Sequence, residues 1–101
     1  MTITLDKITA DDFESNRELP FLAQLGDHIV ELRVLQVRRG KMPPPGLPLR
    51  APFAVVFRAP EIPALEQGVY ALSHPRLGLL ELFIVPIAQA GGCRDYEACF
   101  N

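Results

Sequence analysis

The chain has 101 residues, of which 49% are hydrophobic and 22% are charged, and its formal net charge is −2. This length fits one domain of about 50 to 250 residues, and the composition is that of a packed globular chain rather than a disordered one. The small net charge excludes a strongly basic nucleic-acid-binding protein and an acidic solvating tail. We therefore expect a single domain spanning residues 1–101, with a small core and little room for an enclosed catalytic cleft.

The N-terminal part predicts one short helix. Residues 2–5 favour a strand, and Thr9 followed by Ala10 and two aspartates is typical of a helix start, because the threonine caps the first turn and acids suit its dipole. Phe13 and Leu19 are the large apolar residues that follow. The helix is therefore expected to fix one or two side chains at the edge of a core built elsewhere.

Residues 28–38 alternate apolar and polar side chains with a period of two, which predicts a half-buried strand. The phase of the alternation slips near residues 34–36, as expected for a β-bulge. Residues 39–51 have no periodicity and contain four prolines, so they predict a long exposed Pro-rich loop.

The second half predicts a series of antiparallel strands at residues 53–58, 69–74, 79–87 and 96–100. Residues 74–78 form a predicted hairpin turn, since Pro75 presets φ and Gly78 can take positive φ. If Ala88 pairs with Arg94, one side of the 79–87 strand joins the apolar side of the last strand. The opposite side then carries a second apolar set, made of Leu79, Phe83, Val85 and Ile87.

A strand that is apolar on both faces is typical of a central position in a two-layered or closed structure, or of a subunit interface. Pro86 predicts a bulge within it. The pattern as a whole predicts an all-β fold, a small antiparallel barrel or sandwich of about six strands with one short N-terminal helix. The expected core comprises Val30, Leu32, Val34, Phe53, Val55, Phe57, Tyr70, Leu72, Leu80, Leu82, Ile84, Ala98 and Phe100.

The residues able to do chemistry are few and scattered. His28 and His74 are the only histidines, and their spacing from Cys93 and Cys99 does not match compact zinc motifs. The two cysteines are six positions apart, which in an extended segment is about 20 Å and too far for a disulfide. We expect free thiols, no metal, no cofactor and no catalytic residues.

Two other functions stay open beside a non-enzymatic one. A small barrel enzyme or ligand-binding protein would use His74, with Tyr70 and Glu81 near the same end of the hairpin. A nucleic-acid binder would use the basic segment from Arg33 to Arg58, which lacks interleaved aromatic stacking residues. Recognised nucleophile, phosphate-loop and dinucleotide motifs are missing from the sequence, so we expect no enzyme.

The sequence near the N-terminus lacks the basic start and apolar stretch of a secretory signal. The longest apolar run, residues 82–88, is far below the ~20 residues of a membrane helix. We expect a cytoplasmic protein without a membrane span.

Residues 65–78, 81–87 and 96–101, together with the spacing from Thr9 to Phe13, resemble a small bacterial family known as domain of unknown function 6916. The resemblance covers most of the chain and is densest after Pro52. Cys99 stands where this family is expected to have a β-branched apolar residue. The resemblance implies a single-domain protein and no known activity. It further implies an accessory or assembly role alongside phage-tail-collar-like or tail-fibre-like proteins.

These observations lead to one functional expectation. The protein should be a structural or interaction module that self-associates or binds a protein partner through apolar sheet surface. Binding to a membrane is not expected, and nucleic acid is a less favoured partner.

Overall fold

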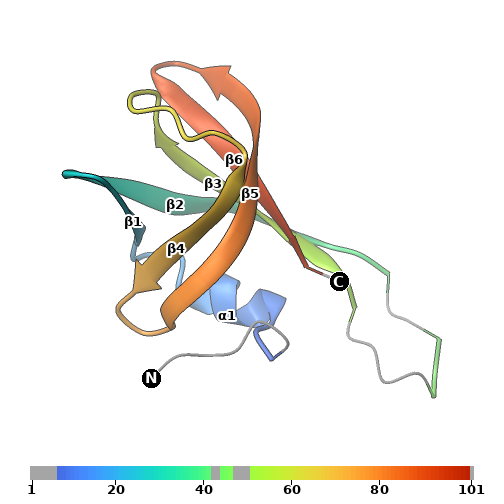
Figure 1. Ribbon diagram of the computed structural model, residues 1–101. Helices are drawn as coiled ribbons and strands as arrows, with labels where there is room; N and C mark the ends of the chain where they lie inside the picture. Colours follow the sequence, from blue (N-terminus) through green and yellow to red (C-terminus); the bar gives the residue numbers. More distant parts are fainter. Residues whose placement is uncertain (1–6, 42–43, 47–50, 101) are drawn as a thin grey trace.

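A computed structural model describes residues 7–41, 44–46 and 51–100. Within them the chain forms one helix and six strands, with the bounds α1 (Ala10–Ser15), β1 (Phe21–Leu25), β2 (His28–Arg39), β3 (Phe53–Pro60), β4 (Gly68–His74), β5 (Gly78–Ala90) and β6 (Cys93–Phe100). The expected all-β fold with one short helix is confirmed, and the closed barrel is the form it takes (Figure 1). The strand expected at residues 2–5 lies outside the described residues, as do positions 42–43 and 47–50 of the Pro-rich loop.

All neighbouring strands are antiparallel, in the order β1-β2-β3-β6-β5-β4. The chain thus makes two consecutive three-stranded meanders, β1 to β3 and β4 to β6. Eight residue pairs join β3 to β6, but only Leu22 with Ser73 and Ala23 with Leu72 join β1 to β4. Closure of the barrel protects the strand edges from pairing with other chains. Of the two contacts that join the meanders, β1 with β4 is shorter than β3 with β6.

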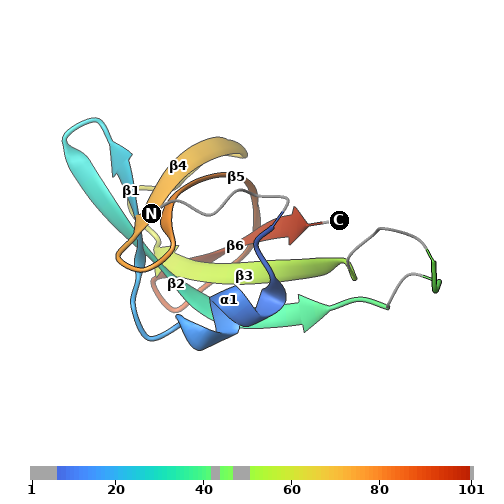
Figure 2. The same ribbon diagram turned by 90° about the horizontal axis from the view of Figure 1, so that it is seen from below.

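Helix α1 lies over β2 and β3 at one end of the barrel (Figure 2). Its first turn is capped as expected, because the Thr9 side chain accepts from the Asp12 N–H at 3.2 Å and the Asp12 carboxylate accepts from the Thr9 N–H at 2.8 Å. This reciprocal capping box satisfies two N–H groups at the helix start. It lets a helix of only six residues hold a fixed position.

Phe13 of α1 is fully buried at the centre of an aromatic cluster. Its ring centroid lies 5.4 Å from that of Phe100, 5.7 Å from Phe21, 6.0 Å from Phe53 and 6.3 Å from Phe57. These separations are in the favourable range for aromatic pairs. The helix therefore closes this end of the barrel core, which is a larger role than the edge position expected from the sequence.

The predicted core residues are buried, except for Tyr70, which is partly buried and packs against the core. The structure adds further buried residues from the helix, the loops and strands β1, β3 and β6: Ile8, Ala10, Phe13, Phe21, Ala23, Ala59, Leu65, Leu77 and Tyr96. Tyr96 is fully buried, and its hydroxyl oxygen accepts a hydrogen bond from the Leu65 N–H at 2.9 Å. This bond fixes the β3–β4 connection against the barrel.

Both predicted bulges are present, one as a register shift between Val34 and Gln36 and the other between Pro86 and Ala88. The expected pairing of Ala88 with Arg94 is wrong, because Ala88 pairs with Asp95. Pro86 still pairs with Tyr96, as that register required. Proline has no N–H to donate to the ladder, and Ile87 beside it is left without a partner on β6. The pairs between this bulge and the β5–β6 turn are therefore shifted by one residue.

Candidate functional site

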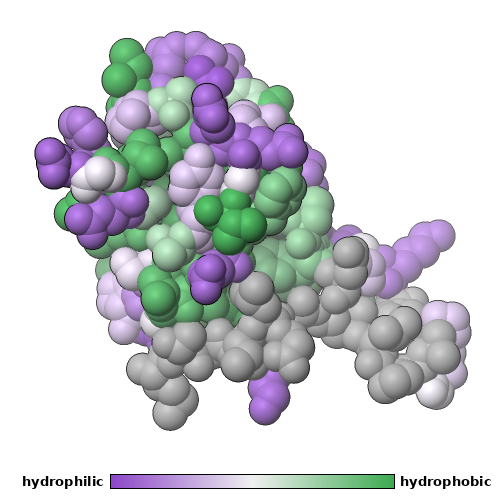
Figure 3. Space-filling view, in the orientation of Figure 1, coloured by the Kyte–Doolittle hydropathy of each residue, from purple (hydrophilic) through white to green (hydrophobic). Residues whose placement is uncertain are grey.

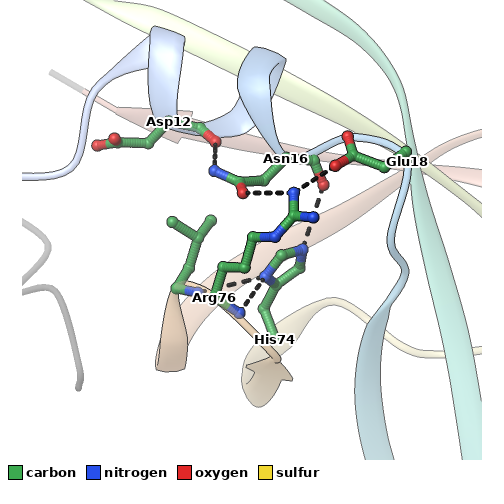
Figure 4. A network of polar contacts seen from close by, with 6 residues as sticks. Asp12, Asn16, Glu18, His74 and Arg76 are labelled. Carbon is green, nitrogen blue, oxygen red and sulfur yellow. Dashed lines mark hydrogen bonds and ion pairs between the residues drawn. The ribbon is translucent and has the colours of Figure 1, made fainter.

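Among the residues that the structure describes, His74 is the polar residue buried in the core, at 4% exposed. Its Nδ1 accepts hydrogen bonds from the N–H groups of Arg76 at 3.1 Å and Leu77 at 3.3 Å, and its Nε2 lies 3.2 Å from the carbonyl oxygen of Asn16 (Figure 4). Because Nδ1 accepts, Nε2 carries the proton and donates it to that carbonyl. The ring also packs on Phe21, with centroids 4.6 Å apart. Both nitrogens are engaged by backbone groups, so His74 stabilises the β4–β5 turn.

Side chains also join the β4–β5 turn to the residues that follow α1. The Arg76 guanidinium pairs with the Glu18 carboxylate and lies 3.4 Å from Asn16 Oδ1, while Asn16 Nδ2 donates to the carbonyl oxygen of Asp12 at 2.7 Å (Figure 4). A hydrogen bond from the Glu18 backbone, followed by the bond from Arg76, holds the pKa of the Glu18 carboxyl below its usual value. These are structural contacts between the turn and the helix.

The three residues of the alternative ligand or enzyme site do not come together. On β4, the side chains of Tyr70 and His74 point toward the barrel interior. The Tyr70 hydroxyl donates a hydrogen bond to the carbonyl oxygen of Glu66 at 2.7 Å. Glu81 is exposed on the outside of β5, opposite Ala71. The barrel wall therefore separates this carboxylate from the His74 imidazole.

The other chemistry-bearing residues are also dispersed. His28 is exposed at the start of β2, and Cys93 and Cys99 are free thiols as expected. Burial first, and then the nearby Glu97 carboxylate, raise the pKa of the Cys99 thiol. Among the described residues, no group of three or more His, Cys, Asp or Glu side chains is placed to hold a metal ion.

The basic segment from Arg33 to Arg58 has its charges largely paired within the chain. Its ion pairs are Arg38 with Glu97 at 3.2 Å, Arg39 with Asp11 at 2.7 Å, Arg58 with Asp95 at 2.8 Å and, at the longer distance of 3.9 Å, Arg33 with Glu31. The hydrogen bond from Arg58 to Asp95 raises the pKa of that guanidinium. Arg50 lies outside the described residues. Arginines that are paired within the chain offer fewer free charges to a nucleic-acid backbone than unpaired ones do.

The outer surface of β4 and β5 has the most exposed apolar side chains on neighbouring strands. We call Val69, Leu79, Phe83 and the Glu81 between them the β4–β5 face. Val69 is 63% exposed, directly opposite Phe83 at 52%, and Leu79 is also 52% exposed. Figure 3, in the orientation of Figure 1, shows apolar surface over these strands, interrupted by polar groups.

The alternation along β5 predicted that Leu79 and Phe83 lie on one face and Leu80, Leu82 and Ile84 on the other. The structure buries the second set in the core. The sequence did not single out Val69. The alternation of Tyr70, Leu72 and His74 toward the interior is the pattern that could have placed Val69 outside.

The described part of the chain contains no helix long and apolar enough to cross a membrane. No curated protein and no solved structure matches this chain. The family model with the description "Domain of unknown function (DUF6916)" matches residues 8–100, from just before α1 to the end of β6. The match includes the β4–β5 turn and the terminal strand that carried the resemblance, and the chain therefore belongs to the DUF6916 family.

Proposed function

We propose that this protein is a non-enzymatic interaction module that binds another protein through the β4–β5 face. The observation that supports it most directly is the cross-strand pair of Val69 and Phe83, both more than half exposed on a barrel whose core is otherwise closed. Large apolar side chains that adjoin on a surface mark interaction sites more often than isolated ones do. Removing such surface from water would contribute about 25 cal/mol per Å² buried.

The non-enzymatic part of the proposal is supported by His74. This imidazole is the buried titratable group closest to a conventional catalytic residue, yet its two nitrogens are bonded to the backbone. A general base needs a nitrogen within reach of the substrate proton. His74 would have to break the β4–β5 turn to provide one.

Charge on the face favours a different protein over a second copy of the chain. Glu81 lies between Leu79 and Phe83 and makes no ion pair within the described residues. Two copies packed about a twofold axis through this position would bring their carboxylates together, which costs free energy at a desolvated contact. We infer a partner that presents an apolar patch with a lysine or arginine opposite Glu81.

Site-specific photo-crosslinking in the native host tests this proposal. A benzophenone amino acid replaces Phe83 in one variant and Ile29 in the control, since Ile29 is 66% exposed but lies on β2. The proposal predicts a discrete crosslinked protein from position 83 that is lost on adding Glu81→Lys. Equal products from both positions, or the chain's own dimer alone, would contradict it.

The family resemblance proposes where to look for the partner. Tail-fibre-like and tail-collar-like proteins of the same host are the first purified candidates, in keeping with an accessory role in assembly. The free thiols of Cys93 and Cys99 are consistent with a reducing compartment, and we place the interaction in the cytoplasm. A crosslinked partner unrelated to tail proteins would remove the assembly role and leave the interaction function standing.

A further inference from the structure

A cleft opens on the barrel wall where β2 continues beyond the end of β3. β2 begins at His28, but its pairing with β3 begins only at Arg33 opposite Arg58. The space measures about 590 Å³ and is bounded by β2, the end of β3 and the β5–β6 turn. Pockets that hold small molecules usually measure about 300 to 1,000 Å³. The cleft therefore has the size for a small organic ligand.

The lining of the cleft is largely apolar. The bulge between Val34 and Gln36 leaves Leu35 without a pairing partner on β3, and this side chain lines the cleft while 38% exposed. The Arg17 guanidinium donates to the Leu35 carbonyl oxygen at 2.8 Å and so fixes the bulge. Bulges commonly redirect a side chain in this way. Ala59, which is 3% exposed, also borders the cleft.

Two guanidinium groups lie at this apolar lining, and they differ in how they are neutralised. Arg58 makes two hydrogen bonds to the Asp95 carboxylate, at 2.8 and 3.1 Å. Arg33 makes no hydrogen bond within the described residues, and its nearest carboxylate oxygen, on Glu31, is 3.9 Å away. Like charges directly opposite each other on neighbouring strands are unfavourable. Glu31 offsets the charge of Arg33 only at the longer distance of 3.9 Å and without a hydrogen bond, so the N–H donors of Arg33 stay available.

We propose that this cleft binds a small amphipathic carboxylate, with the anionic group on Arg33 and the apolar body against Leu35 and Ala59. Arginine can donate two parallel N–H bonds to one carboxylate. This suits the Arg33 guanidinium, which has no hydrogen-bond acceptor among the described residues. The carboxylates of Glu31 and Asp95 offset much of the positive charge of the two guanidiniums, and they repel a dianion more strongly than an anion with one charge. A phosphate monoester therefore fits less well than a carboxylate with a single charge.

The experiment uses octanoate as the probe and isothermal titration calorimetry with the whole chain. Octanol and octylamine have the same chain length with a neutral and a cationic head, so they separate the charge from the apolar body. We expect octanoate to bind more tightly than octanol and octylamine not to bind at the cleft. Equal affinity for octanoate and octanol would overturn the role of Arg33.

Variants locate the binding. Arg33→Gln should weaken octanoate binding by about tenfold, the usual scale for losing a charged hydrogen bond. Arg38→Gln is the matched control, because Arg38 is on the same strand but pairs with Glu97 outside the cleft. Both side chains are more than half exposed, so neither change threatens the fold. Equal losses in the two variants would contradict the proposal.

The two thiols provide a second, independent measurement. Cys93 lines the cleft, whereas Cys99 lines a different one beside Phe53 and Phe100. Octanoate should slow alkylation of Cys93 by N-ethylmaleimide and leave the rate at Cys99 unchanged. Protection of both thiols, or of neither, would contradict binding in this cleft. Phe83→Ser should bind octanoate normally, so failure of this proposal and failure of the interaction function can be told apart.

Discussion

Truncating Phe13 should show that the short helix is part of the barrel core. The side chain is 0% exposed and its ring lies within 5.4 to 6.3 Å of four other phenylalanine rings. Emptying a buried aromatic site usually costs about 3 to 5 kcal/mol, a range that already includes the lost contacts with neighbouring rings. Because α1 has only six residues and can shift to fill part of the space, we expect about 4 kcal/mol for Phe13→Ala.

Urea unfolding followed by far-ultraviolet circular dichroism measures this loss. With a slope of about 1 to 3 kcal/mol per molar urea, the midpoint should fall by about 1.3 to 4 M. Phe83→Ala is the matched control, since it deletes the same atoms from a side chain that is 52% exposed, and it should cost less than about 1.5 kcal/mol. A loss for Phe13→Ala no larger than that control would refute the view that the helix closes the core.

Three further predictions concern the cap and two titrating groups. Thr9→Ala should destabilise the protein by about 1 kcal/mol in the same urea assay, because it removes the helix cap, and an unchanged midpoint would contradict this. The pKa of Glu18 is lowered from 4.5 in the folded state, so its stabilisation is complete above that value and fades as the pH falls below it. The melting temperature of Glu18→Gln should therefore lie below that of the wild type at pH 7, and the difference should shrink as the pH is lowered below 4.5; a difference that stays constant over this range would count against the account. Burial and the Glu97 carboxylate raise the pKa of the Cys99 thiol above 9.0. Glu97→Gln should therefore increase the thiolate fraction and speed alkylation of Cys99 by iodoacetamide at pH 8. Equal rates for the variant and the wild type would show that Glu97 does not raise this pKa.

The strands were predictable because period-two alternation depends only on which face is buried. It placed Phe57, Leu82 and Phe100 in the core and Phe83 on the opposite face of β5, which the structure shows to be the outside of the barrel. The missing N–H of Pro86 was enough to predict a bulge. These features are local, so the sequence specifies them directly.

Features that depend on distant segments were not predictable in the same way. Phe13 is one apolar residue in a short polar helix, and its central place depends on four rings brought together from β1, β3 and β6. The burial of His74 depends on the carbonyl of Asn16, which is 58 positions away. The cleft beside Arg33 depends on where β3 ends relative to β2. No periodicity in the sequence encodes such relations between elements.

The most direct measurement of the interaction function is the affinity of the purified crosslinked partner for three forms of the protein. Burying the exposed half of the Phe83 side chain is worth about 1 to 1.5 kcal/mol, so Phe83→Ser should weaken binding by about tenfold. Ile29→Ser, which removes a similarly exposed side chain from β2, should bind like the wild type. Equal dissociation constants for the wild type and Phe83→Ser would contradict the assignment of the β4–β5 face as the binding surface.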